Sequence, residues 1–180
     1  KFQIPSFQRG YRWDKKQVED LIDDLKKFVI SNQKTYYLQP LVVRKVEKDL
    51  YEVLDGQQRL TTILILLHSL YEKMDADNRE YYEGRLYNVV YANRQPIDFN
   101  NLQNVNPDLG MDEFYVHMAW RIISKSVKNM VGDDTIYRTK ITSAIFHKNE
   151  REQLVKFIWY VVDSSDDLSA IKIFNNLNKG

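Results

Sequence analysis

The chain has 180 residues, of which 26 are basic and 25 acidic, so its formal net charge is only +1. This balance excludes a general electrostatic attraction to nucleic acid or to anionic membranes. The absence of cysteine excludes disulfides, thiolate zinc sites and cysteine nucleophiles, and is typical of a reducing compartment. The longest apolar stretch, residues 60–70, is too short to cross a bilayer. We therefore expect a soluble, cytoplasmic protein with no membrane partner, and read the chain as a piece of a longer one.

Residues 1–13 contain a proline, a glycine and four aromatic residues without helical periodicity, which predicts an extended arm held against the domain. Tyr11 and Trp13 could stack on a base, but aromatic residues in such an arm more often pack against the protein body, so we assign them a structural role. Asp14 and Gln17 then form a capping box for a helix. Its apolar face comprises Val18, Leu21, Ile22, Leu25, Phe28 and Val29.

A hairpin and a buried helix are predicted next. Residues 36–47 and 50–54 are rich in β-branched and aromatic side chains and are separated by a Lys48-Asp49 turn. The second strand runs into Asp55-Gly56. From residue 57 or 58 to about residue 73, apolar residues and threonines occupy every face, as in a helix buried on most sides.

The rest of the chain predicts a largely helical section and a return to the sheet. We expect helices near residues 77–88 and 111–131, with a loop over residues 93–107. A buried strand is predicted over residues 154–162, and Ser165 caps a last helix at 166–176. The fold class is therefore α+β, with a small mixed sheet. Its core spans residues 1–76 and 150–180, and residues 77–149 form a helical insertion or subdomain.

The strand-to-helix turn at residues 55–62 carries the clearest chemistry. Such a turn directs unpaired backbone N–H groups and the positive end of the helix dipole at one point, which suits a phosphate. Gly56 permits close backbone approach, and Arg59 adds a cation whose planar donors match phosphate oxygens. Asp55 could hold a divalent metal or orient a water. The threonine hydroxyls one turn further on could also bind phosphate; these are Thr61 and Thr62.

A structural interpretation of the same turn competes with this one, because Asp-Gly is a common turn dipeptide and aspartate a common helix cap. The structural interpretation does not explain why two glutamines and an arginine lie between Asp-Gly and an apolar helix, where their polar groups need partners. Elsewhere, the three histidines, His68, His117 and His147, lack the spacing of a zinc or HNH site, and His68 fits a core position. No Walker or Gly-x-Gly-x-x-Gly sequence is present, and we expect no nuclease centre in this chain.

Three motifs together resemble the N-terminal domain of GmrSD-type restriction proteins. They are IPSFQRGYRW at residues 4–13, DGQQRLTT at residues 55–62, and FNNLNKG at residues 174–180. The resemblance implies a core related to ParB and sulfiredoxin, a following HNH nuclease domain in the same parent chain, and a role in defence against phage with modified DNA. It also implies binding and hydrolysis of nucleoside triphosphates by the Asp-Gly-Gln-Gln-Arg motif.

Carried over to this chain, the resemblance assigns the nucleotide site. Asp55, Gln57, Gln58 and Arg59 form the catalytic set, and Gly56 belongs to the same phosphate loop. The other motifs add Gln8 and Arg9, which close the pocket, and Asn178 from the late motif. Magnesium is the expected cofactor, near Asp55.

The first hypothesis is thus a regulatory domain that binds and hydrolyses GTP, ATP or CTP, in which positioning and charge neutralisation supply most of the catalysis. A second is a DNA-binding module that senses modified DNA without hydrolysing a nucleotide, for which affinity would fall steeply with salt. A third is a catalytically silent scaffold for the nuclease domain.

Overall fold

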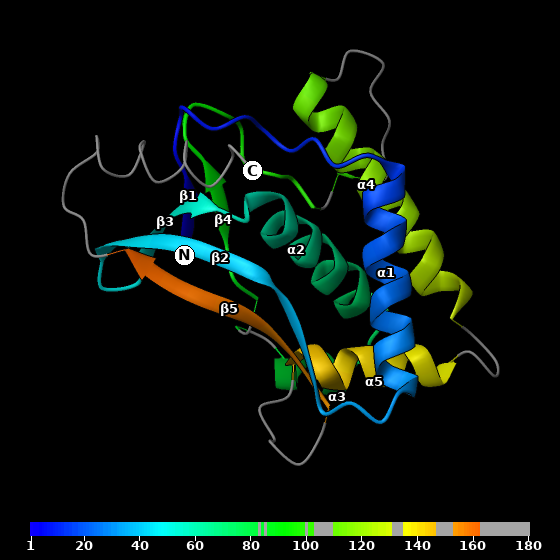
Figure 1. Ribbon diagram of the computed structural model, residues 1–180. Coiled ribbons are helices and arrows are strands. Elements are labelled where there is room, and N and C mark those ends of the chain that lie inside the picture. The colour runs from blue at the N-terminus through cyan, green and yellow to red at the C-terminus, as the bar shows by residue number, and fades with distance from the viewer. Residues whose placement is uncertain are drawn as a thin grey trace.

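The computed structural model describes residues 1–82, 84, 86–99, 101–102, 110–130, 135–146 and 153–162. Within these residues, five strands form one mixed sheet in the order β4-β1-β3-β2-β5, and α2 lies between the sheet and the helices α1 and α4 (Figure 1). The strands are β1 (Phe2–Ile4), β2 (Thr35–Glu47), β3 (Leu50–Asp55), β4 (Val89–Tyr91) and β5 (Leu154–Val162), and the helices are α1 (Lys15–Ile30), α2 (Gln57–Tyr71), α3 (Ala76–Tyr82), α4 (Met111–Asn129) and α5 (Thr135–Phe146). The predicted α+β class is confirmed.

Helix α2 is apolar on every side because it is the middle layer. Leu60 and Leu64 pack on the sheet beside Val43 and Val53. Other α2 residues, among them Ile65, face the helical side of the molecule and share a core cluster with α1, α4 and α5. The prediction of a helix buried on most sides is confirmed.

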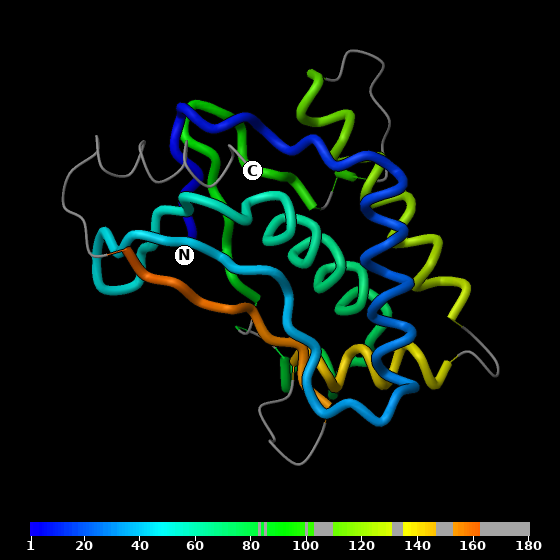
Figure 2. Tube along the Cα trace, viewed as in Figure 1, coloured from blue at the N-terminus to red at the C-terminus, as the bar shows by residue number. Residues whose placement is uncertain are grey.

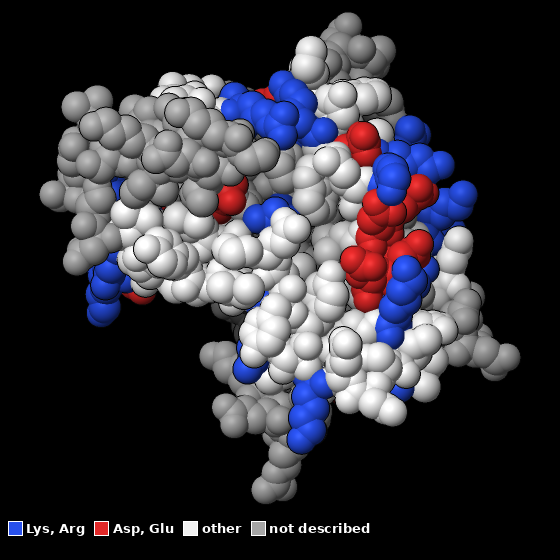
Figure 3. Space-filling model, in the orientation of Figure 1, with Lys and Arg blue, Asp and Glu red and all other residues white. Residues whose placement is uncertain are grey.

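Helix α1 matches its prediction both in the residues that it buries and in its N-terminal cap. The six predicted apolar residues are all buried. Asp14 accepts a hydrogen bond from the Gln17 backbone N–H, and Gln17 Oε1 accepts one from the Asp14 N–H, so the capping box is complete. Acidic residues run along the solvent face of this helix and are flanked by lysines (Figure 3). This face pairs charges at helical spacing, as in the ion pair of Lys16 with Asp20.

The hairpin β2–β3 is antiparallel, as predicted, and β5 runs parallel to β2 along its other edge. The strand predicted over residues 154–162 is confirmed, but its predicted burial is wrong. β5 is an edge strand, and five of its side chains are exposed, namely Lys156, Ile158, Trp159, Tyr160 and Val161. The β2–β5 register shifts between Leu38 and Leu41, where Pro40 has no N–H to donate to the sheet. This irregularity lies beside the turn after β3. A Cβ on Gly56 would stand 3.0 Å from the Pro40 carbonyl oxygen.

The two short strands were not predicted. β1 lies within the arm and pairs in parallel with both β3 and β4. β4 follows a helix that is shorter than expected: α3 ends at Tyr82, and Gly84 has a φ of +73°, a left-handed conformation that ends helices. The helix predicted near residues 77–88 is therefore wrong at residue 84 and at residues 86–88, which are not helical. The loop and helix predicted to follow are confirmed in their described parts, and the helix predicted at 166–176 lies outside the described residues.

After β1 the arm crosses the start of α2 and continues into α1, in dark blue in Figure 2. Tyr11 is buried there, and Trp13 packs against the main core, which confirms their structural role. Among the described residues, no helix combines the length and the apolar character needed to span a bilayer.

Candidate phosphate-binding site

The turn between β3 and α2 leaves the start of the helix without a side-chain cap. Gly56 is the N-cap residue, with φ +91° and ψ +6°, and contributes no side-chain oxygen. The N–H groups of the first helical turn have no acceptor inside the helix. Only glycine adopts this conformation without strain, and a Cβ would also crowd Pro40 and Leu41. An anion at this helix end would satisfy the amides and the helix dipole together.

Arg59 lies at the turn, held by β2. Its Nη1 donates to Gln39 Oε1 at 2.7 Å and its Nη2 to the Pro40 carbonyl oxygen at 2.9 Å. The Asp55 carboxylate is 3.9 Å from Nη2. The Arg59 side chain is 19% exposed, and its pKa is lowered by burial, an effect that Asp55 partly offsets. Two of the three partners of this cation are thus neutral oxygens, and the third is the Asp55 carboxylate.

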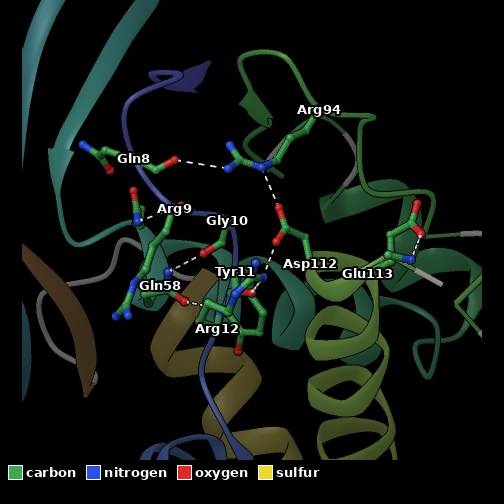
Figure 4. A network of polar contacts seen from close by, with 11 residues as sticks. Gln8, Arg9, Gly10, Tyr11, Arg12, Gln58, Arg94, Asp112 and Glu113 are labelled. Carbon is green, nitrogen blue, oxygen red and sulfur yellow. Dashed lines mark hydrogen bonds and ion pairs between the residues drawn. The ribbon is translucent and has the colours of Figure 1, made fainter.

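Gln58 fastens the arm to the helix. Its Nε2 donates to the Gly10 carbonyl oxygen at 3.0 Å, and its Oε1 accepts the Arg12 backbone N–H at 2.7 Å (Figure 4). Both ends of this amide are therefore occupied by the arm. Gln58 was predicted to lie with the phosphates; its side-chain amide is occupied by backbone groups of the first motif and positions that motif against the second.

Gln57 and Gln8 complete this contact. Gln57 Nε2 donates to the Arg9 carbonyl oxygen at 3.2 Å. Gln8 Nε2 donates to the carbonyl oxygens of Val53 and Leu54, at the end of β3. The arm is thus bonded to both elements that meet at the turn, so the first and second sequence motifs lie side by side.

Within the part of the chain that the structure describes, three buried polar atoms at this junction have no hydrogen-bond partner: Gln8 Oε1, Gln57 Oε1 and Arg59 Nε. Buried side-chain oxygens and nitrogens are nearly always paired with protein or with ordered water. Their concentration here marks the junction as a place where water or a polar ligand would be stabilised.

The two threonines of the second motif face the core. Thr61 Oγ1 lies 2.7 Å from the Tyr91 hydroxyl, and Thr62 Oγ1 lies 2.8 Å from the Tyr11 hydroxyl. Thr62 gives its own hydrogen to the Gln58 carbonyl oxygen, so Tyr11 must be the donor in the second pair. Both threonines are fully buried. Their hydroxyls are committed to core contacts, which argues for a structural role and against phosphate contact.

An ion-pair network holds the arm on its other side, and no sequence pattern predicted it. Asp112, at the start of α4, pairs with Arg12 of the arm and with Arg94 after β4, and Arg94 also donates to the Gln8 carbonyl oxygen (Figure 4). These three residues are far apart in sequence, and no motif links them. In the same view the Arg9 side chain points away from Asp112, and Arg9 is exposed.

A comparison with known protein families shows to which family the chain belongs. The sequence matches the family described as GmrSD restriction endonuclease, N-terminal domain, over residues 1–180, the whole chain. The chain belongs to this family. No curated protein matches it.

Membership in the GmrSD family confirms the resemblance drawn from the three motifs, and the structure brings two of the three together. The third contains Asn178, which lies outside the described residues. Within the described part of this GmrSD domain, no group of three or more histidine, aspartate or glutamate side chains could hold a metal ion. Asp55, whose side chain is 35% exposed, offers a single carboxylate at the turn. One carboxylate together with ligand phosphates is the usual donor set for nucleotide-borne magnesium, so the residues present fit that ion.

Proposed function

We propose that this GmrSD-family domain binds a nucleoside triphosphate with its phosphates at the turn between β3 and α2, and that it serves a restriction protein as a regulatory domain that hydrolyses the nucleotide. The observation that carries the proposal is the start of α2, which is capped by a left-handed glycine and flanked by Arg59. A polyanion at this point would interact with backbone N–H groups, the helix dipole and a guanidinium together.

Each residue of the site has a distinct part in this proposal. Gly56 allows the phosphate to approach the helix end, and Arg59, already oriented by Gln39 and Pro40, lies ready to neutralise charge. Arg9 is exposed and adds a second cation from the arm. Asp55 would hold the magnesium ion, which supplies charge neutralisation when bound. Gln57 Oε1, buried and unpaired, is an acceptor that could orient a water.

The arrangement suits phosphoryl transfer because that reaction depends mainly on positioning and on electrostatic stabilisation. The contacts of Gln8, Gln57 and Gln58 hold the arm in place before a ligand arrives. Little reorganisation is then needed when the phosphates bind, which is the condition for effective electrostatic catalysis.

A titration of GTP, ATP and CTP with magnesium tests the proposal, with binding and phosphate release measured on the same samples. Arg9→Gln is the sharpest variant, because Arg9 is exposed and its loss should leave the fold intact. We expect affinity to fall by about 1.5–3 kcal/mol, the range for a hydrogen bond to a charged group. Arg59→Ala should weaken binding similarly.

Arg121→Gln, an exposed arginine on α4, is the matched control and should bind as the wild type does. Equal affinity of the wild type and both site variants would remove the assignment. Binding without phosphate release would support the scaffold hypothesis. Salt-sensitive binding of DNA with no binding of triphosphate would support the DNA-binding hypothesis.

A further inference from the structure

The arm is held from two sides at Gly10 (Figure 4). On one side, Gln58 of α2 donates a hydrogen bond to the Gly10 carbonyl oxygen. On the other, the Asp112 carboxylate of α4 lies so close to Gly10 that a Cβ at this position would collide with it. Gly10 does not have a positive φ, so its backbone conformation would also suit alanine. The close approach of Asp112 therefore explains the glycine at this position.

Two arginines keep the Asp112 carboxylate in place. It pairs with Arg12 of the arm and with Arg94 after β4. The Arg12 guanidinium also donates to the Tyr11 carbonyl oxygen. Arg94 donates to the Gln8 carbonyl oxygen. Asp112 is thus connected, through these two cations, to the arm backbone both before and after residue 9.

Arg9 lies within the segment that these contacts hold. Its side chain is exposed, and its carbonyl oxygen accepts a hydrogen bond from Gln57 of α2. An exposed arginine side chain has many rotamers, so the position of its backbone decides where the guanidinium can reach. The contacts from α2 join neutral groups, whereas the ion pairs of Asp112 join full charges, which interact more strongly. The place of Arg9 therefore depends on α4 as well as on α2.

We propose that Asp112 is a positioning residue for triphosphate binding, which holds the arm from the α4 side and so keeps Arg9 beside the β3–α2 turn. This role rests on the proposed function, in which Arg9 is one of the two cations for the phosphates. It predicts that removal of the Asp112 carboxylate weakens triphosphate binding. Long-range electrostatics alone predicts the opposite, because the loss of a negative charge near the site would favour an anion.

The test compares the affinities of the wild type and Asp112→Asn for GTP, ATP and CTP with magnesium, by calorimetry. The Asp112 side chain is 28% exposed and asparagine has nearly the same shape, so the variant should fold. We expect binding to weaken at least about fivefold, the lower end of the usual coupling between separate sites. Gly10→Ala, which displaces the carboxylate without changing any charge, should weaken binding as well. Glu113→Gln is the matched control, because this exposed carboxylate bonds to Gly110 rather than to the arm, and it should bind as the wild type does.

Two double variants distinguish positioning from a general loss of structure. In the Arg9→Gln background, Asp112→Asn should weaken binding no further, because the side chain through which it acts is gone. In the Asp112→Ala background, Gly10→Ala should likewise cause no further loss, because the carboxylate that it displaces is gone. Amide hydrogen exchange adds a measurement without nucleotide: the Arg12 N–H, which is bonded to Gln58, should exchange faster in Asp112→Asn than in the wild type.

Failure of this role and failure of the proposed function give different results. Unchanged or tighter triphosphate binding in Asp112→Asn would overturn the role of Asp112 alone. So would losses in Asp112→Asn and Arg9→Gln that simply add in the double variant. A wild type that binds no triphosphate would overturn the proposed function, and the positioning role with it.

Discussion

At the scale of the residue, the pKa of the His68 side chain depends on its buried environment. His68 lies on α2, and its ring stacks on Phe99 with the centroids 3.6 Å apart. Burial lowers its pKa from 6.5 to about 4. The cation is thus disfavoured in the folded protein and not in the unfolded one. The stability that the neutral ring contributes is complete above about pH 6.5 and is lost as the pH falls towards 4.

We therefore predict that thermal unfolding of the wild type becomes steeply more favourable between about pH 6.5 and 4, and that His68→Gln reduces this slope. The measurement is the melting temperature of both proteins across this range. Arg121→Gln, at an exposed arginine on α4 that stays charged over this pH range, is the control and should keep the wild-type slope. Parallel pH profiles for the wild type and His68→Gln would contradict the assignment.

At the scale of the element, α1 shows how local signals determine a helix. Its capping box satisfies backbone donors that the helix itself cannot pair, and its apolar stripe supplies the packing. We predict that Asp14→Ala lowers the free energy of unfolding by about 1 kcal/mol, the usual cost of losing an N-cap. Urea denaturation measures the difference. Asp14→Asn, which keeps an acceptor oxygen, should retain most of the stability; an equal loss in both variants would show that the cap is not responsible.

The two short strands, unlike α1, carry no local sequence signal that predicts them. β1 and β4 have three residues each, too few to display a period, and they exist because each pairs with a neighbour that is distant in sequence. In the sheet formed by the described residues, β1 lies between β3 and β4 and joins them. Local sequence therefore predicted the arm that contains β1 but not its place within the sheet.

At the scale of the whole molecule, the docking of the arm on α2 connects the proposed phosphate site to the ion-pair network of Asp112. Gln58 is the centre of this contact, because its one side chain binds both the Gly10 carbonyl oxygen and the Arg12 backbone N–H. We predict that Gln58→Ala releases the arm. Trypsin should then cleave after Arg9 and Arg12 faster than in the wild type, and stability should fall by about 1–3 kcal/mol, because the paired groups of the arm lose their partner.

Limited proteolysis followed by mass spectrometry measures the cleavage rate at each site. Gln3→Ala, a glutamine to alanine change in β1, is the control and should leave the rates unchanged. An arm as resistant in Gln58→Ala as in the wild type would show that other contacts hold it. In the same variant we expect weaker triphosphate binding, since Arg9 would no longer be held beside the turn.

The sequence by itself determined the periodic elements and the turn with its motif. α1, α2, the hairpin and β5 each carry an apolar pattern, a cap or a turn within a few residues, and these signals act locally. The glycine turn at the start of α2 is likewise a local signal. Family membership also follows from sequence, through three motifs in order.

Only the tertiary structure decided what the motif residues contact. Gln58 fastens the arm, and Thr61 and Thr62 bond to tyrosines in the core, because segments about 30 to 50 positions apart fold against each other. The Asp112 carboxylate likewise pairs with arginines from two segments that are distant from it in sequence. A side chain's partners are set by packing between elements, and that packing minimises the free energy of the whole chain rather than of any local stretch.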